Sequence, residues 1–187
     1  MSALLTSTLV VAVAEIGDKT QLLSLMLAAR FRRPWPIVLG IFVATLANHF
    51  VAAWVGDWVA GALGPQTLRW LLAVSFIAIA LWALKPDELD NDQSARRSMG
   101  VFATTLVAFF IAEIGDKTQV ATIAMAAKYS DLTAVVMGTT LGMMVANVPV
   151  VFLGERIVKR LPLKTIRWFA AGMFVVMGVA VLLGLGA

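Results

Sequence analysis

Six long apolar stretches constrain the fold of this chain more than any other feature of its sequence. They cover residues 3–30, 35–61, 67–85, 99–127, 132–158 and 165–186. Each stretch approaches or exceeds the roughly 20 residues that a helix needs to cross a bilayer. Hydrophobic residues make up 60% of the chain and charged residues only 14%, less charge than a soluble domain of this length carries. We therefore expect an all-α integral membrane protein with six transmembrane helices.

The lysine and arginine residues predict the orientation of these helices in the membrane. Eleven of them lie in three connections between the apolar stretches, near 30–36, 85–98 and 155–167. The other connections contain only Arg69 and Lys128. Basic residues concentrate in the cytoplasmic connections of membrane proteins. We therefore expect both termini outside and the 86–98 linker in the cytoplasm, with membrane lipid rather than nucleic acid around the basic residues.

The two halves of the chain repeat each other at an offset of 98 residues. Glu15 to Gln21 align with Glu113 to Gln119 and Gly40 aligns with Gly138, without a gap. Each half carries three predicted spans, an odd number, so the second half would enter the membrane from the opposite side. Such inverted-topology repeats are typical of secondary transporters, whose sites lie at the repeat interface near the midplane.

This repeat predicts the organisation of the chain. We expect a first three-helix repeat at 1–88, a cytoplasmic linker at 89–98 and a second three-helix repeat at 99–187. The two inverted-topology three-helix repeats would form one transport unit.

The sequence Glu-Ile-Gly-Asp-Lys-Thr-Gln occurs once in each half, near the middle of the first apolar stretch. Charged groups at this depth in a bilayer are costly and usually functional. Glu15 and Asp18 are three residues apart, so a helix carries both carboxylates on one face, and Glu113 and Asp116 repeat this spacing. We predict that these four carboxylates converge on one metal site between the repeats.

Other polar residues of the two motifs are expected to support this metal site. They are Lys19, Thr20, Gln21, Lys117, Thr118 and Gln119. The lysines would pair with carboxylates of their own or the facing repeat, and the threonines would supply hydroxyls or cap a broken turn. The glutamines would add amide oxygens if the helices are kinked there. Gly17 and Gly115 leave little bulk between the acids and allow close helix approach or local unwinding.

The ligands on offer are hard oxygens, because the chain contains no cysteine. Carboxylate and amide oxygens suit Mg²⁺, Ca²⁺ and Mn²⁺. Four carboxylates and two lysines have a net charge of −2 when all are ionised, so one divalent ion would neutralise the set. Clustered carboxylates repel one another and therefore also bind protons more readily. Competition between protons and metal for the same groups suggests a cation/proton antiporter.

Two copies of Glu-x-Gly-Asp-Lys-Thr, one in the first span of each half, resemble the Golgi-type manganese/calcium cation/proton exchanger family. Bacterial members of this family include the MneA-type manganese exporters, and the resemblance covers essentially the whole chain. It implies exchange of Mn²⁺, Ca²⁺ or both for protons, with Glu15, Asp18, Glu113 and Asp116 as ligands. It favours a manganese exporter of the bacterial plasma membrane, in which the ion is a transported substrate and no cofactor is needed.

The single histidine, His49, is a further candidate in the second apolar stretch. It follows Asn48 and aligns with Asn147 in the second half. A histidine at this depth either relays protons or forms an interhelical hydrogen bond with Asn147 as its counterpart. We favour the hydrogen bond.

Three alternatives to a manganese exporter stay open at this stage. The nearest is a Ca²⁺/H⁺ antiporter, since Mn²⁺ and Ca²⁺ use similar oxygen ligands. More distant alternatives are an exporter of amino acids or organic cations, and a non-transporting membrane scaffold with a buried ion-pair core. No nucleophile with a neighbouring base and no phosphate-binding loop is recognisable, so we do not expect an enzyme. The sequence does not determine the oligomeric state.

Overall fold

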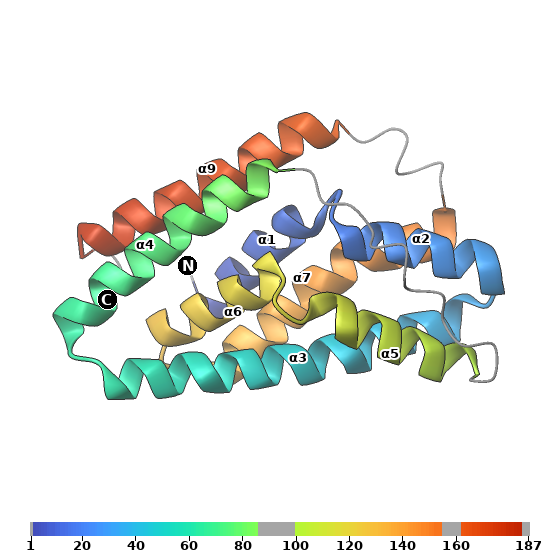
Figure 1. The fold of residues 1–187 in the computed structure, drawn as a ribbon, viewed down its shortest axis with the longest axis horizontal. Coiled ribbons are helices and arrows are strands. Elements are labelled where there is room, and N and C mark those ends of the chain that lie inside the picture. Colours follow the sequence, from blue (N-terminus) through green and yellow to red (C-terminus); the bar gives the residue numbers. More distant parts are fainter. Residues whose placement is uncertain (1, 86–99, 155–161, 185–187) are drawn as a thin grey trace.

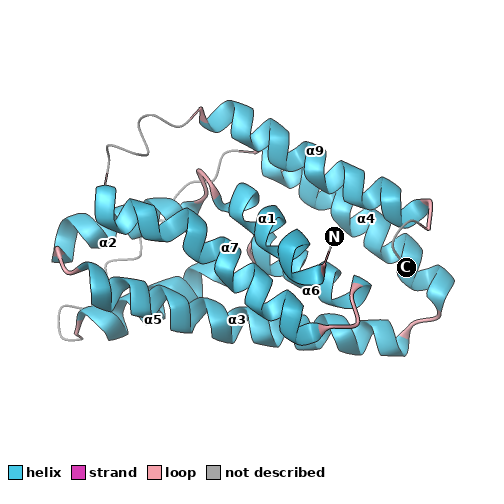
Figure 2. Ribbon diagram, turned by 180° about the vertical axis from the view of Figure 1, so that it is seen from behind, coloured by secondary structure: helices cyan, strands magenta, loops and turns pink. Residues whose placement is uncertain are grey.

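Every regular element in the described part of the chain is a helix. The computed structural model describes residues 2–85, 100–154 and 162–184 (Figures 1 and 2). The helices of the first half are α1 (Ala3–Glu15), α2 (Lys19–Phe31), α3 (Pro34–Ala62) and α4 (Pro65–Leu84). Those of the second half are α5 (Val101–Glu113), α6 (Lys117–Lys128), α7 (Leu132–Leu153) and α9 (Leu163–Leu182). The predicted linker at 89–98 lies outside the described residues.

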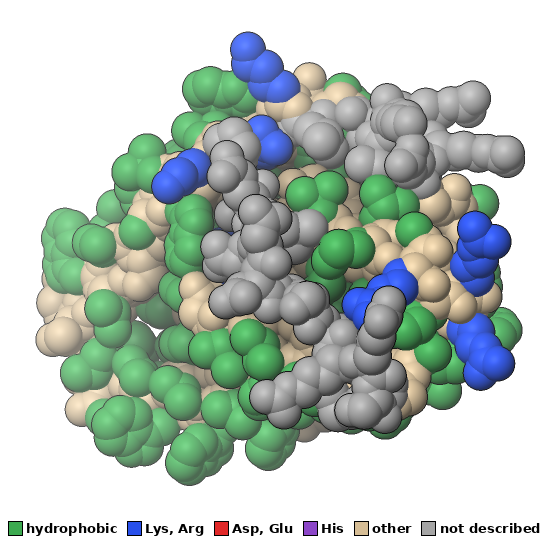
Figure 3. Space-filling model, turned by 45° about the vertical axis from the view of Figure 1, so that its right-hand side comes forward, with side chains coloured by type: hydrophobic (Ala, Val, Ile, Leu, Met, Phe, Trp, Pro, Cys, Tyr) green, Lys and Arg blue, Asp and Glu red, His purple; other side chains and the backbone are tan. Residues whose placement is uncertain are grey.

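Four of these helices, α3, α4, α7 and α9, are long and apolar enough to cross a bilayer. The helices α1 and α5 are also apolar but shorter. Large hydrophobic side chains are exposed along these helices, among them Trp54 on α3, which is 61% exposed. The face in Figure 3 accordingly displays hydrophobic and basic side chains over most of its described area. Such extensive apolar exposure is expected where lipid, rather than water, surrounds the helices. The all-helical, membrane-type fold is therefore as predicted.

The repeat in the sequence is also a repeat in the helices. The bounds of α1 and α5, and those of α4 and α9, differ by 98 residues at both ends. The starts of α2 and α6, and of α3 and α7, differ by the same offset. In Figure 1, α4 and α9 lie side by side and run in opposite directions. Each half therefore folds into the same succession of two short and two long helices.

Glycines mark two equivalent helix crossings between the halves. A Cβ atom built on Gly40 of α3 would lie only 2.7 Å from the Cβ of Thr105 in α5. One built on Gly138 of α7 would lie 2.8 Å from the Cβ of Ser7 in α1. Ser7 and Thr105 are themselves 98 residues apart. The long central helix of each half therefore packs closely against the first helix of the other half, as small residues allow.

The stretches 3–30 and 99–127 are not continuous helices, as six uninterrupted spans would require. Each is divided at the duplicated motif, between α1 and α2 and between α5 and α6. Gly17 and Gly115 have φ angles of 81° and 72°, in the left-handed region that glycine enters without steric cost. A right-handed helix cannot pass through such residues, so the local unwinding that these glycines allow takes place at both motifs.

Candidate cation site

The two helix breaks are closed by the glutamines of the motifs. The backbone N–H of Gly17 donates to Gln21 Oε1 at 2.9 Å, and that of Gly115 donates to Gln119 Oε1 at 2.8 Å. These bonds satisfy backbone donors that the broken helices leave without carbonyl partners. The two amide oxygens therefore hold the shape of the breaks, in addition to any role as ligands. Gln21 also donates through Nε2 to the carbonyl oxygen of Ala146 in α7, at 3.1 Å.

Three motif carboxylates meet where the two breaks face each other. Glu15, Asp18 and Asp116 each place one oxygen within 4.8 Å of the others. All three side chains are buried. An ion bonded to oxygens at about 2.0–2.6 Å holds opposite ligands roughly 4–5 Å apart. The separation of these oxygens therefore suits one divalent cation. We call Glu15, Asp18 and Asp116 the carboxylate group.

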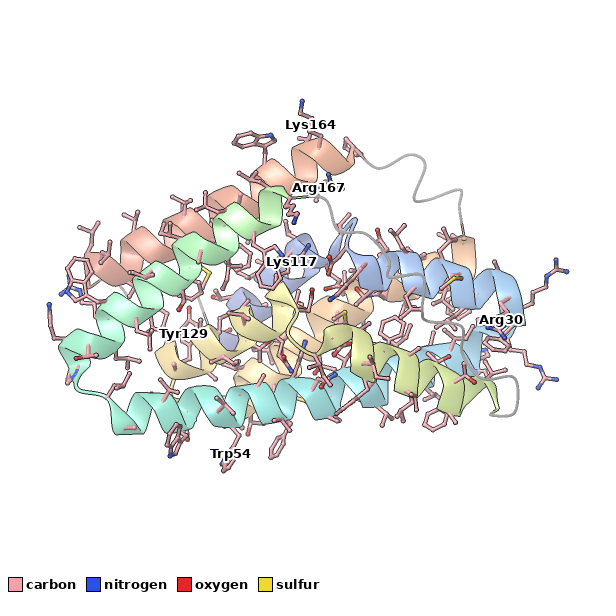
Figure 4. The ribbon with its side chains drawn as sticks, in the orientation of Figure 1. Arg30, Trp54, Lys117, Tyr129, Lys164 and Arg167 are labelled. Carbon is pink, nitrogen blue, oxygen red and sulfur yellow. The ribbon has the colours of Figure 1, made fainter. Side chains whose placement is uncertain are left out.

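The motif lysines cross between the halves. Lys117 Nζ lies 2.7 Å from Asp18 Oδ1, and Lys19 Nζ lies 3.2 Å from Asp116 Oδ1. Each lysine thus pairs with the aspartate of the facing half. The pairs differ in exposure, because the Lys117 side chain is 4% exposed and that of Lys19 is 26% exposed. Figure 4 shows Lys117 at the centre of the molecule, close to the break between α5 and α6.

Glu113 is the predicted ligand that lies outside the carboxylate group. Its Oε1 accepts a hydrogen bond from the Thr45 hydroxyl at 2.5 Å, and its Oε2 accepts one from Asn48 Nδ2 at 3.2 Å. Both donors belong to α3 of the other half. Of the four carboxylates predicted to converge, the structure thus brings together three. The fourth, Glu113, is instead hydrogen-bonded to side chains of α3.

Glu15 has the opposite environment. Its side chain is fully buried, and neither of its oxygens has a hydrogen-bond partner among the described residues. A buried carboxylate without donors is costly unless a bound cation or a proton neutralises it. This carboxylate therefore points to a positively charged ligand more directly than any other group at the site.

The two motif threonines also differ. Thr118 donates to Asp116 Oδ2 through its hydroxyl at 3.1 Å and its backbone N–H at 3.4 Å, so Asp116 caps the start of α6. The hydroxyl of Thr20 is buried and has no partner within the described ranges. The cap of the second break is thus Asp116 and not Thr118, whose hydroxyl instead donates to the Asp116 carboxylate.

The candidate residues around His49 occupy separate positions. Asn48 binds Glu113, as described above. Asn147 accepts a hydrogen bond from the Ser24 hydroxyl at 2.8 Å, which joins α2 to α7. His49 is fully buried, and neither ring nitrogen has a partner in the part of the chain that the structure describes. The described residues therefore do not supply the interhelical hydrogen bond that we favoured for His49.

Sequence reasoning missed Thr45. Its position in the second half is occupied by Met143, so the internal repeat gives no signal for it. A signal was nevertheless present, because Thr45, Asn48 and His49 are three and four residues apart and share one helix face. A polar face of this kind within an apolar span marks the side that meets other polar groups.

Comparison with known proteins decides the family. The family model described as "Divalent cation/proton antiporter GDT1" matches residues 3–91 and 101–186. The chain belongs to the GDT1 family of divalent cation/proton antiporters. The resemblance drawn from the paired motifs is therefore confirmed.

Two relatives illustrate the range of this family. A protein of Vibrio cholerae serotype O1 named "Putative manganese exporter" is 54% identical over 181 residues, covering 96% of this chain and 90% of the relative. A GDT1-like protein of Synechocystis is 25% identical over 195 aligned positions, covering 93% of each chain. No solved structure matches this chain significantly. Membership of a transporter family agrees with a multi-pass membrane protein that is not an enzyme.

Proposed function

We propose that this chain exports Mn²⁺ across the bacterial plasma membrane in exchange for protons. The observation that carries the proposal is the buried carboxylate group of Glu15, Asp18 and Asp116, in which Glu15 has no donor among the described residues. The group lies where the two helix breaks meet, in a member of a cation/proton antiporter family.

Manganese is the favoured ion for two reasons. The side-chain ligands available are carboxylate, amide and hydroxyl oxygens, which suit Mn²⁺ without excluding Ca²⁺. The Vibrio cholerae relative, 54% identical over 96% of this chain, is named for manganese export. Ca²⁺ is therefore the comparison ion in the test below.

The proposed topology has six spans, with each broken helix pair crossing the membrane once. The helices α1 and α2 contain 13 residues each, which together are long enough for one span. We propose two inverted three-span repeats, 1–88 and 99–187, with both termini outside and the 86–98 linker in the cytoplasm. The matching helix bounds and the distribution of basic residues support this arrangement.

In the proposed mechanism, the positive charge of the crossed lysines is replaced by that of the entering ion. Without an ion, Lys19 and Lys117 balance the aspartates of the facing motif. An entering Mn²⁺ takes over that role at the carboxylates, and protons compete with it for the same oxygens. Rocking of one half against the other then exposes the group to alternate sides of the membrane, as in other inverted-repeat carriers.

The test is ion flux into proteoliposomes that contain the full chain. With an acidic lumen, outward proton movement is expected to drive Mn²⁺ inward, and nigericin with potassium is expected to stop the flux by collapsing the pH gradient. Glu15→Gln should reduce the flux to that of protein-free liposomes, because it removes a charged ligand. The control is Asp57→Asn, at an exposed position on α3.

Ca²⁺, Mg²⁺ and Zn²⁺ are measured in the same way. Faster transport of Ca²⁺ than of Mn²⁺ would identify a calcium exchanger. Mn²⁺ flux that persists without a pH gradient would contradict proton exchange. Absence of flux for every ion would instead favour a non-transporting scaffold.

A further inference from the structure

The two motif glutamates occupy equivalent positions but have different surroundings. Both side chains are fully buried, and they are 98 residues apart. Glu113 accepts hydrogen bonds at both carboxylate oxygens, from Thr45 and Asn48. Glu15 accepts none from the described residues and contributes an oxygen to the carboxylate group.

The sequence explains this difference. At the offset of 98, Thr45 aligns with Met143 and Asn48 aligns with Ala146. Neither methionine nor alanine has a side-chain hydrogen-bond donor. The second half therefore lacks the donors that the first half offers to Glu113.

The positions of Met143 and Ala146 in space match this alignment. A Cβ atom built on Gly142 would lie 2.9 Å from the backbone nitrogen of Ala12, three residues before Glu15. The carbonyl oxygen of Ala146 accepts a hydrogen bond from Gln21, beyond the break. The segment of α7 that passes the first break is thus the equivalent of the α3 segment that carries Thr45 and Asn48 past the second break.

We propose that Thr45 and Asn48 are positioning residues that hold Glu113 away from the cation in this conformation, so that the two motif glutamates have unequal roles. The inference rests on the proposed function. Glu15 is the ligand that is ready to bind the ion, whereas Glu113 reaches the ion only by leaving its two donors. Because those donors lie on the other half of the chain, their release belongs to the movement of one half against the other.

This proposal predicts opposite effects on binding and turnover. Without the Thr45 and Asn48 donors, Glu113 is free to join the carboxylate group, so the ion binds more tightly and leaves more slowly. Hydrogen bonds to charged groups are among the strong ones in proteins, so their loss changes affinity by about tenfold or more. Both the Kd and the KM for Mn²⁺ are therefore expected to fall, and the maximal rate is expected to fall with them.

The decisive variant is Thr45→Val combined with Asn48→Ala in the full chain. The Kd is measured from the electron paramagnetic resonance signal of free Mn²⁺, and KM and maximal rate from Mn²⁺ flux in proteoliposomes. Thr45→Ser, with Asn48 unchanged, is expected to retain the wild-type values because it keeps the hydroxyl donor. The matched control is Thr139→Val in α7, where a buried hydroxyl donates, within the described residues, only to carbonyls of its own helix, at 2.9 and 3.1 Å.

The reciprocal variant transfers the donors to the other half. Met143→Thr with Ala146→Asn offers hydrogen bonds to Glu15 and is expected to raise the Kd for Mn²⁺ about tenfold, because Glu15 must then give them up to bind the ion. If the Thr45/Asn48 variant does not elute as a single species in size-exclusion chromatography, the reciprocal variant alone decides.

Failure of the inference and failure of the proposed function have different signatures. Wild-type Kd, KM and maximal rate in the Thr45/Asn48 variant, or weaker binding in it, would overturn the positioning role. Tighter or unchanged binding in the reciprocal variant would overturn it as well. Absence of Mn²⁺ binding and flux in the wild-type protein would instead overturn the proposed function.

Discussion

At the scale of single residues, the crossed lysine pairs bind the two halves with unequal strength. Lys117 and Asp18 are both buried and 2.7 Å apart, whereas Lys19 is 26% exposed and lies 3.2 Å from Asp116. Removing one partner of a buried ion pair leaves an uncompensated charge and costs roughly 3–5 kcal/mol. Asp116 is also buried, but it keeps two hydrogen bonds from Thr118 when Lys19 is removed, and Lys19 itself is partly exposed, so loss of this pair costs less. The pair formed by Lys117 therefore dominates the stability of the site.

We expect Lys117→Met to lower the midpoint of thermal unfolding in detergent more than Lys19→Met does. The loss should be larger in Lys117→Met, because that change separates two buried charges. It should be smaller in Lys19→Met, because Thr118 still donates two hydrogen bonds to Asp116. Saturating Mn²⁺ should restore part of the lost stability in Lys117→Met, because the ion supplies the missing positive charge. Equal losses in the two variants, or no effect of Mn²⁺ on either, would contradict this account.

At the scale of elements, the helix breaks depend on glycine conformation. Gly115 has a φ of 72°, and a Cβ atom built there would have no neighbour within 4 Å. A side chain at this position therefore meets no steric clash, and its cost is that of the left-handed backbone. For residues other than glycine that cost is about 1–2 kcal/mol.

Gly115→Ala is accordingly expected to lower the free energy of unfolding by about 1–2 kcal/mol and to slow transport, because the second break carries Asp116. Gly61→Ala, within α3, is the matched control. It also has open space around the added Cβ atom, and its helical backbone should make the change neutral or slightly stabilising. The free energies are measured by denaturant unfolding in micelles and the rates by flux. A variant at Gly115 as stable as wild type would show that the break does not need glycine.

The element scale also shows what the sequence could predict. The helical class, the membrane-length helices and the convergence of Glu15, Asp18 and Asp116 follow from hydropathy, spacing and the offset of 98. The placement of Glu113 does not, because its partners Thr45 and Asn48 are 68 and 65 residues away and have no polar counterparts in the second half. Repeat analysis predicts equivalent contacts, and the two halves differ at this point.

At the scale of the whole molecule, the halves are interlocked rather than placed side by side. The helix α3 packs against α5 and α6 of the second half, and α7 packs against α1 and α2 of the first. Neither half encloses the carboxylate group alone, since Glu15 and Asp18 come from one and Asp116 from the other. In the proposed topology, this interlocking places the site deep within the bilayer.

The absence of cysteine allows that topology to be tested cleanly. We expect a membrane-impermeant maleimide to label Ser2→Cys in intact cells, and to label Arg33→Cys only after the cells are permeabilised. Both positions are exposed. The unmodified chain provides the blank, because it has no thiol to react. Labelling of both variants in intact cells, or of Arg33→Cys alone, would refute the proposed orientation.

The crossed lysine pairs also impose an order on biosynthesis. Lys117 is synthesised 98 residues after Lys19, and chains grow at about 5–20 residues per second, so the first motif waits roughly 5–20 s for its partners. During that time the nascent first half carries Asp18 and Lys19 without the facing charges that they contact in the finished protein. The ion site thus cannot form before the second motif has been synthesised, and the insertion machinery has to hold an incomplete, charged half until then.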